Sequence, residues 1–243
     1  MRRARAPLGE LATGERTLDP ASAHYLTRVL RLRDGDTFVA FDPARGIEAE
    51  ARIVSAGAEG VVIVAGELHA RSDPRVEITW IHGCAKGDKL DAVVRDATEL
   101  GVTRFLVAAT ERSVVKLGEE RSLSRRTRWE RIAREAARQS ERADAPRVEG
   151  PLGWEDALGE VDPSAARFVL WEQARAPLAA PLAFALSTGS ALAFAAGPEG
   201  GLTDVEARSA EEKGWTLASL GPLILRTETV AAAVLGAVRV LEG

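Results

Sequence analysis

The sequence predicts an α/β protein of two domains, a small β-rich domain over residues 1–71 and a larger α/β domain over residues 72–243. Before residue 71, short alternating apolar runs are separated by Gly- and Pro-containing turns, a pattern typical of a compact β-barrel. After a polar boundary at Arg71-Ser72-Asp73-Pro74, apolar strands alternate with helical patterns, which predicts a largely parallel sheet.

The first domain is expected to contain three strands and one short helix. Each strand alternates apolar and polar residues and ends in turn chemistry such as Asp42-Pro43 or Gly57–Gly60. The expected strands are 36–41, 47–54 and 61–64, and the expected helix is 21–30.

The second domain is expected to contain five strands and four helices. Gly101 is a C-cap for the first helix, and Thr203 with Glu206 forms a capping box at the start of the third. The expected strands are 76–80, 105–108, 166–170, 191–195 and 217–220. The expected helices are 89–100, 124–140, 204–213 and 227–241.

Composition narrows the class of protein. Hydrophobic residues make up 46% and charged residues 28%, as in an ordinary globular protein. No run of 18 apolar residues occurs, and the basic N-terminus leads into no apolar h-region, so we expect neither a membrane span nor a signal peptide. One cysteine, Cys84, and three histidines argue against a structural zinc site. We therefore expect a cytoplasmic protein without a metal.

The net charge of −4 and the pI of about 5.6 lower the expectation of a nucleic-acid-binding protein. The arginines are nevertheless clustered, while lysine occurs only at four positions. A coding bias would explain the excess of arginine equally well. The two clusters are Arg28, Arg31 and Arg33, and then Arg121, Arg125, Arg126, Arg128, Arg131, Arg134 and Arg138.

Two segments have the composition of a ligand site, and both follow predicted strands. Gly197–Thr203 (GPEGGLT) lets the backbone approach a ligand and offers free N–H groups at the next helix, although a plain structural turn has the same pattern. Leu220–Thr229 (LGPLILRTET) is an apolar loop that suits an adenine ring, or else a buried crossover loop with Thr227 as a helix N-cap. Ligands of open α/β sheets bind beyond the carboxyl ends of strands.

Together these segments closely resemble the SPOUT class of methyltransferases. Within that class, the chain resembles the bacterial family that methylates N3 of a uridine in the decoding region of 16S ribosomal RNA. Further blocks also match the family and occur in the same order, so that the resemblance covers nearly the whole chain. The block at His24–Leu32 resembles the family's PUA-like RNA-binding domain. The blocks are His24–Leu32, Lys86–Asp91, Ala97–Val102, Thr110–Val114 and Arg131–Ser140.

The chain also departs from the family's pattern. The family usually has Glu-Gln-Ser-Gly-Arg where this chain has Arg138–Arg142, which leaves open a role for position 138 or 141. Residues 1–11 lack the family's aromatic start, which blurs one strand of the barrel.

The resemblance implies a deep C-terminal trefoil knot that holds S-adenosylmethionine, in a homodimer to which the Ala-rich segment Val230–Val240 could contribute the interface. True knots are otherwise nearly absent from proteins. No metal is implied, because the sulfonium already activates the methyl group. The implied cofactor-binding residues are Leu170, Gly197, Gly200, Gly201, Leu220, Gly221, Leu225, Arg226 and Thr229.

Methylation of uracil N3 requires an acceptor for the N3 proton and donors for the charge that spreads onto O2 and O4. Arg226 is the candidate for stabilising that charge, and Glu199 or Glu228 for accepting the proton or holding Arg226. The implied partner is the small ribosomal subunit. Arginines are expected to contact its RNA phosphates, namely Arg28, Arg31, Arg33, Arg112, Arg125 and Arg142.

Three alternatives stay open at this point. The chain could be a SPOUT enzyme that methylates ribose 2′-O, or a ribosome-assembly factor that binds RNA without catalysis. A nucleotide-dependent α/β enzyme is the third, but both G-x-G-x-x-G and the Walker motif are absent.

Overall fold

The structure is a computed structural model, and it describes residues 4–42, 45–57, 60–70, 76–113, 119–140, 142 and 144–242. Contacts divide the chain into two compact units, Met1–Asp73 with Ala137–Ala145, and Pro74–Ala136 with Pro146–Gly243. The expected domain boundary at 71–74 lies outside the described residues, as does Glu141 of the segment Arg138–Arg142 that differs from the family's pattern.

The first unit contains a six-stranded sheet in its described part. Its strands are β1 (Arg5–Pro7), β2 (Gly14–Thr17), β3 (Thr37–Asp42), β4 (Ile47–Gly57), β5 (Gly60–Ala65) and β6 (His69–Ala70). They run in the order β1-β3-β4-β5-β2, with β6 beside β4, and only the β1–β3 pair is parallel. Alternate residues of β4 face the core, because successive side chains of a strand point to opposite faces.

A short helix completes this unit's core. The carboxylate of Asp19 accepts hydrogen bonds from the Ala21 and Ser22 amides and starts α1 (Pro20–His24). The chain continues as the π-helical turn η1 (Tyr25–Val29), which places Leu26 in the core. The expected helix over 21–30 is therefore present, but its second half is wound more widely than an α-helix.

The second unit is built on a six-stranded parallel sheet in the order β12-β10-β11-β7-β8-β9. Its strands are β7 (Ile78–Gly83), β8 (Arg104–Ala109), β9 (Arg147–Gly153), β10 (Ala166–Leu170), β11 (Leu192–Ala196) and β12 (Thr216–Ala218). The register pairs Leu170 with Ala196, Ala196 with His82, and Leu170 with Ala218. The carboxyl ends of four strands therefore meet at one edge of the sheet.

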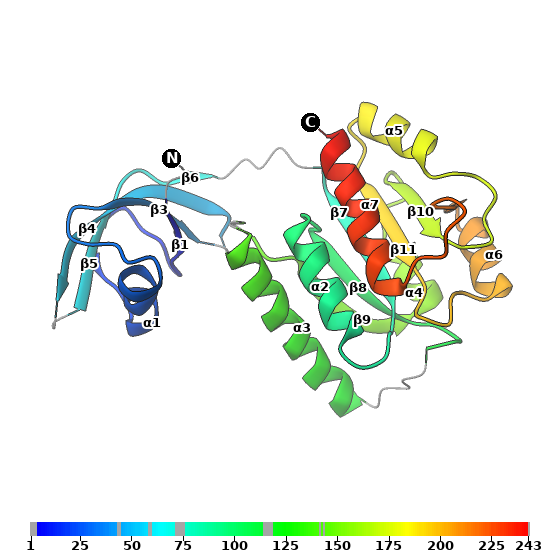
Figure 1. Ribbon diagram of the computed structural model, residues 1–243, viewed down its shortest axis with the longest axis horizontal. Coiled ribbons are helices and arrows are strands. Elements are labelled where there is room, and N and C mark those ends of the chain that lie inside the picture. The colour runs from blue at the N-terminus through cyan, green and yellow to red at the C-terminus, as the bar shows by residue number, and fades with distance from the viewer. Residues whose placement is uncertain are drawn as a thin grey trace. The chain divides into compact units, whose positions relative to one another are not determined.

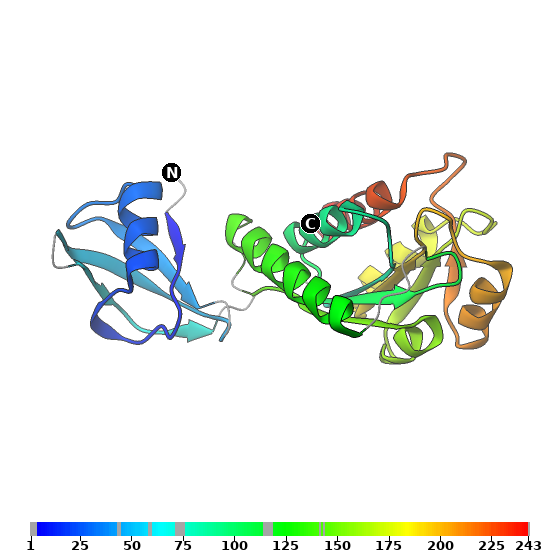
Figure 2. The same ribbon diagram turned by 90° about the horizontal axis from the view of Figure 1, so that it is seen from below.

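Helices cover both faces of this sheet (Figures 1 and 2). One core cluster lies under α2 (Lys89–Glu99), α3 (Glu119–Gln139), α5 (Ala179–Ser187) and α7 (Thr227–Leu241). The other lies under α4 (Trp154–Gly159) and α6 (Asp204–Glu212). Adjacent residues of β8 alternate between the two clusters, Phe105 in the first and Leu106 in the second. In the described part of the chain, no helix has the length and apolarity needed to cross a membrane.

Several expected bounds need correction. β7 begins at Ile78 and runs to Gly83 instead of covering 76–80, because His82 still pairs with β11 and Gly83 with β8. α3 begins at Glu119 instead of Ser124. β12 spans Thr216–Ala218 instead of 217–220, since the chain leaves the sheet into the apolar loop.

Candidate functional site

A cavity of about 670 Å³ opens at the carboxyl edge of the second unit's sheet. Its wall comes from the end of β10, from the glycine segment after β11, and from the loop between β12 and α7. The two segments singled out in the sequence therefore lie on one cavity. Residues that line it include the predicted Leu170, Gly197, Glu199, Gly200, Gly201, Leu220, Gly221, Leu225, Arg226 and Glu228.

The glycine segment needs its glycines. A Cβ on Gly197 would lie 2.9 Å from the carbonyl carbon of Gly201. Gly201 has a φ of +71°, and a Cβ there would lie 2.9 Å from Oε1 of Glu172. The Arg112 guanidinium donates a hydrogen bond of 2.9 Å to the Gly200 carbonyl and holds the turn from outside. The backbone is thus folded tightly against the cavity.

The helix after this segment is anchored by its capping box. Oγ1 of Thr203 accepts from the Glu206 amide, and Oε2 of Glu206 accepts from the Thr203 amide at 2.9 Å. The other oxygen of Glu206 accepts from the Glu111 amide at 2.7 Å, so the loop after β8 is tied to the same helix. The predicted capping box is confirmed.

The apolar loop is uncovered in the described part of the chain. Leu223 is 76% exposed and Ile224 is 86% exposed, and both line the cavity. Gly221 has a φ of +110° and allows the turn that brings them there. The alternative of a buried crossover loop is wrong, because these side chains do not lie in the core.

The first turn of α7 brings polar groups to the cavity. Arg226 occupies the N-cap position and is exposed, and its guanidinium has no hydrogen-bond or ion-pair partner among the described residues. Oε2 of Glu228 is buried and likewise lacks a hydrogen-bond partner there. The alternative role of Thr227 as the N-cap is wrong, since Thr227 is already the first helical residue and its hydroxyl donates to the Gly197 carbonyl at 2.9 Å.

Glu199 is held by basic and backbone groups. Its Oε1 lies 3.1 Å from Nζ of Lys89 and accepts from the Lys86 amide at 3.2 Å. Partial burial acts to raise the pKa of Glu199, but the hydrogen bonds from its own amide, from Lys89 and from Lys86 outweigh it and hold that pKa below its ordinary value. Glu199 is therefore an ionised anchor for the loop and a weak proton acceptor.

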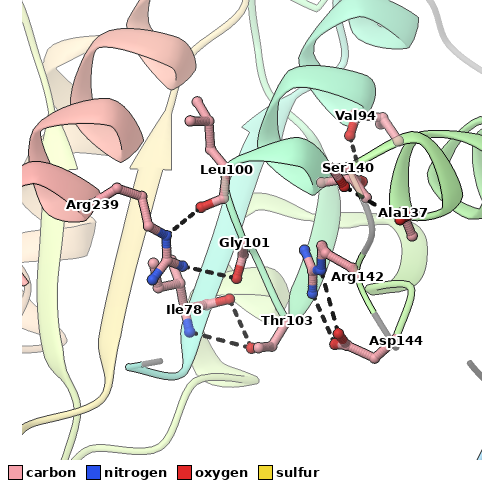
Figure 3. Close-up of polar contacts among 11 residues, drawn as sticks. Ile78, Val94, Leu100, Gly101, Thr103, Ala137, Ser140, Arg142, Asp144 and Arg239 are labelled. Carbon is pink, nitrogen blue, oxygen red and sulfur yellow. Dashed lines mark hydrogen bonds and ion pairs between the residues drawn. The ribbon is translucent and has the colours of Figure 1, made fainter. Parts of the chain in front are cut away.

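The structure also places the remaining predicted residues. Thr229 is exposed and is not among the residues that line the cavity. Arg125 lies beside the buried Cys84; burial raises the pKa of that thiol, which the Arg125 charge lowers in part. Arg142 is only 2% exposed and forms an ion pair of 2.8 Å with Asp144 (Figure 3).

The arginines of the first unit are at its surface. Arg28, Arg31 and Arg33 are exposed, and Arg28 and Arg33 line a groove between the end of the helical segment and the β4–β5 hairpin. The groove has a volume of about 590 Å³ and an apolar floor that includes Leu32 and Val61.

Sequence reasoning missed three cavity-lining groups and one buried histidine. Trp171 and Glu172 follow β10, and Lys89 starts α2, all at strand ends or helix starts where a ligand is expected. Trp171 Nε1 is buried without a hydrogen-bond partner in the described chain. His82 is fully buried behind the cavity.

Comparisons with known proteins agree with this arrangement. A family model described as an RNA methyltransferase domain matches residues 72–239, and one described as an RNA methyltransferase PUA domain matches residues 18–65. The chain is 32% identical to a ribosomal RNA small subunit methyltransferase E of Bacillus subtilis, covering 88% of this chain and 86% of the relative. It is 33% identical to the protein of that name from Synechocystis, covering 93% and 73%.

The fold matches a solved structure equally well. The ribosomal RNA small subunit methyltransferase E from Neisseria gonorrhoeae, bound to S-adenosyl methionine, superposes with a TM-score of 0.81 at 28% identity and covers 99% of this chain and 98% of that one. Fold and site therefore define an RNA methyltransferase of the SPOUT class with a PUA domain, which confirms the predicted fold class. The chain belongs to the ribosomal RNA small subunit methyltransferase E family.

The cavity fits S-adenosylmethionine. It is bordered by a tight glycine turn with no room for side chains, and by exposed Leu223 and Ile224. Two lining residues have buried polar atoms without a hydrogen-bond partner among the described residues, Glu228 at Oε2 and Trp171 at Nε1. A ligand with an apolar ring, hydroxyls and an amine suits such a wall. The prediction of this cofactor is confirmed for the family by the cofactor-bound relative.

Proposed function

We propose that the enzyme transfers the methyl group of S-adenosylmethionine to N3 of one uridine in the decoding region of 16S rRNA. The main support is that the glycine segment and the apolar loop, about 20 residues apart, form one cavity with Arg226 and Glu228 on its wall. When bound, S-adenosylmethionine supplies a methyl group already activated by a sulfonium.

We further propose how the chain would hold the cofactor. Backbone groups of Gly197, Gly200 and Gly201 border its polar part, while Leu220 and Leu225 of the apolar loop contact the adenine. Leu170 at the end of β10 closes the cavity from the sheet. Thr229 is left out of this set because its side chain is exposed away from the cavity wall.

The proposed chemistry uses two side chains of α7's first turn. Arg226, exposed at the cavity and without a partner among the described residues, would donate hydrogen bonds to the uracil oxygens as negative charge develops on them. Glu228, whose Oε2 has no hydrogen-bond partner in the described part of the chain, is the better candidate for accepting the N3 proton. Glu199 is the poorer one, because Lys89 and the Lys86 amide already stabilise its carboxylate.

RNA binding is assigned to the first unit. We propose that residues 1–71 form the RNA-binding domain and residues 72–243 the methyltransferase domain, with Arg28, Arg31 and Arg33 contacting phosphates. Arg112 would contact RNA only with the part of its guanidinium that the Gly200 carbonyl leaves free. Arg125 and Arg142 are weaker candidates, since Arg125 lies against Cys84, and Arg142 is itself buried and paired with Asp144.

The assembly is part of the same proposal. We propose a homodimer in the cytoplasm, with the exposed Val240 and Leu241 of α7 near the interface. We also propose that the segment from β12 into α7 completes a trefoil knot. Its support is that β12 pairs with β10, whereas α7 packs on α2 across the same sheet.

The experiment is transfer of labelled methyl from S-adenosylmethionine to small ribosomal subunits that lack their own modification, and to naked 16S rRNA, followed by nucleoside mass spectrometry. We expect 3-methyluridine. A 2′-O-methyl nucleoside would assign the chain to the other SPOUT reaction, and cofactor binding without incorporation into either substrate would contradict the proposed reaction.

A further inference from the structure

A hydrogen-bonded chain behind the cavity joins three segments that are far apart in the sequence. His82 lies near the end of β7, Thr227 lies in the first turn of α7, and Gly197 begins the glycine segment after β11. Nε2 of His82 is 2.9 Å from Oγ1 of Thr227, and that hydroxyl donates to the Gly197 carbonyl at 2.9 Å. His82 is 0% exposed and Thr227 is 8% exposed.

The donor and the acceptor of each hydrogen bond around His82 and Thr227 can be assigned. Nε1 of Trp80 lies 3.2 Å from Nδ1 of His82, and an indole N–H can only donate, so Nδ1 is an acceptor. The proton of the neutral imidazole is then on Nε2 and is donated to Thr227. Burial keeps the ring neutral, since it lowers the pKa of His82 to about 4 against a smaller opposite effect of Glu199.

The backbone is closely packed at the same place in the fold. A Cβ on Gly83 would lie 2.5 Å from the Pro198 ring, so the end of β7 and the start of the glycine segment are in close contact. Thr227 is also flanked in sequence by Arg226 and Glu228, which both line the cavity. A shift of Thr227 would therefore move both of them relative to the glycine segment.

We propose that His82 is a positioning residue for methyl transfer: through Thr227 it fixes the first turn of α7 against Gly197, and so holds Arg226 and Glu228 at the cofactor cavity. This inference rests on the proposed function of that cavity. His82 itself is not among the residues that line the cavity, so it acts only through Thr227.

Two substitutions of His82 separate this role from a purely structural one. In His82→Gln the side-chain amide reaches the position of Nε2 and can still donate to Thr227, but the Trp80 indole loses its acceptor. In His82→Asn the amide oxygen takes the position of Nδ1 and keeps the Trp80 bond, but the bond to Thr227 is lost. Each variant loses one buried hydrogen bond, so we expect similar decreases in melting temperature.

Activity should distinguish the pair. We expect kcat to fall about 10- to 100-fold in His82→Asn with a nearly unchanged KM for the subunit, because small displacements of catalytic groups have effects of that size. His82→Gln should recover most of the lost rate. In calorimetry, the Kd for S-adenosylhomocysteine should be about tenfold higher in His82→Asn than in His82→Gln. A change of this size is expected when loss of one hydrogen bond displaces part of the cavity wall.

The partner residue offers the same comparison. Thr227→Val removes the hydroxyl at nearly constant shape, and Thr227→Ser keeps it. We expect Thr227→Val to match His82→Asn, Thr227→Ser to recover most of the rate, and the double variant His82→Asn with Thr227→Val to be little worse than either single one. Additive losses in the double variant would contradict a shared role.

NMR spectroscopy tests the hydrogen bonds of His82 without an activity measurement. The protein has three histidines, so ¹⁵N-labelled imidazoles can be assigned by single substitutions. His82 should be neutral with its proton on Nε2 at pH 7; a proton on Nδ1 would overturn the inference, as would equal kinetics and binding in His82→Asn and His82→Gln. Failure of the proposed function is distinguishable, because it would appear in the wild-type protein itself, as a product other than 3-methyluridine or as no methyl incorporation.

Discussion

Arg239 donates a hydrogen bond of 2.6 Å from Nε to the carbonyl oxygen of Leu100 (Figure 3). The same guanidinium donates at 3.1 Å to the Gly101 carbonyl and pairs with Glu242, whose other oxygen accepts from the Val76 amide. These carbonyls are at the end of α2, where helix carbonyls lack intrahelical partners and a cation is favourable. The end of α7 is therefore fastened to α2 and to the entry of β7.

This arrangement predicts a large effect on stability from Arg239→Ala. Removal of the guanidinium leaves two carbonyls and the partly buried Glu242 without their donor, so the free energy of unfolding should fall by roughly 2–3 kcal/mol. Urea unfolding followed by circular dichroism measures it. Arg131→Ala removes an exposed i,i+4 pair with Glu135 and should cost about 0.5 kcal/mol or less; equal effects would contradict the assignment.

Gly197→Ala should weaken cofactor binding. Its methyl would lie 2.9 Å from Gly201 and 3.1 Å from the Leu202 amide, both backbone atoms, so the turn must open. We expect the Kd for S-adenosylmethionine to rise about tenfold or more, the equivalent of about 1.4 kcal/mol. Gly159→Ala, at the end of α4 with open space around its Cβ, is the matched control in calorimetry. Unchanged binding in Gly197→Ala would show that the turn is not part of the cofactor site.

His82 should make stability depend on pH. Its pKa is about 4 in the folded protein against an ordinary 6.5, so the unfolded chain binds more protons between these values. The stability from neutral His82 is present above pH 6.5 and is lost as the pH falls toward 4. The loss should be about 3 kcal/mol, at 1.36 kcal/mol per pKa unit. Urea titrations at pH 7 and pH 4 should show a smaller decrease in the free energy of unfolding for His82→Gln than for the wild type. Equal decreases in the two proteins would show that the imidazole is in contact with water.

Arg28 and Arg33 should contribute to RNA affinity through phosphates. Substitution of both by Gln should weaken binding to the subunit's RNA and should reduce the slope of log K against log salt by about 1.5 to 2, which corresponds to two phosphate contacts. Filter binding across a salt series measures the slope. If affinity falls while the slope stays the same, these arginines do not neutralise phosphates.

Periodicity and capping residues predicted the second unit well. β10 was expected at its observed bounds, and Thr203, Glu206 and Gly101 mark helix ends where the structure has them. These features depend on local chemistry, namely a side-chain acceptor for free amides and a residue that tolerates positive φ.

Elements whose local sequence contradicts their fold were missed. α5 contains Pro181, which is tolerated because it lies in the first turn, where the amide has no helical partner. β9 contains Gly150 and Pro151, which fit at the edge of the sheet, where only one neighbour needs backbone hydrogen bonds. Composition alone does not show that Pro181 lies in a first turn or that Gly150 and Pro151 lie in an edge strand.

The site was predicted in part. The two loop segments were identified because glycines and an apolar loop follow strands, and both line the cavity. His82 could not be identified from the sequence, because its bonds to Thr227 and Trp80 arise only from the fold. Arg142 was expected at the surface, since sequence does not reveal that it is buried against Asp144.

The most direct test of the central claim is primer extension through the decoding region of 16S rRNA after treatment of unmodified small subunits with enzyme and S-adenosylmethionine. A methyl group on N3 removes the donor on the Watson–Crick edge of uracil, so reverse transcriptase should stop next to one uridine. The stop should be weaker by about 100-fold in rate with Arg226→Ala, as for loss of a charge-stabilising donor. Read-through with the wild-type enzyme, despite methyl incorporation, would contradict methylation at N3.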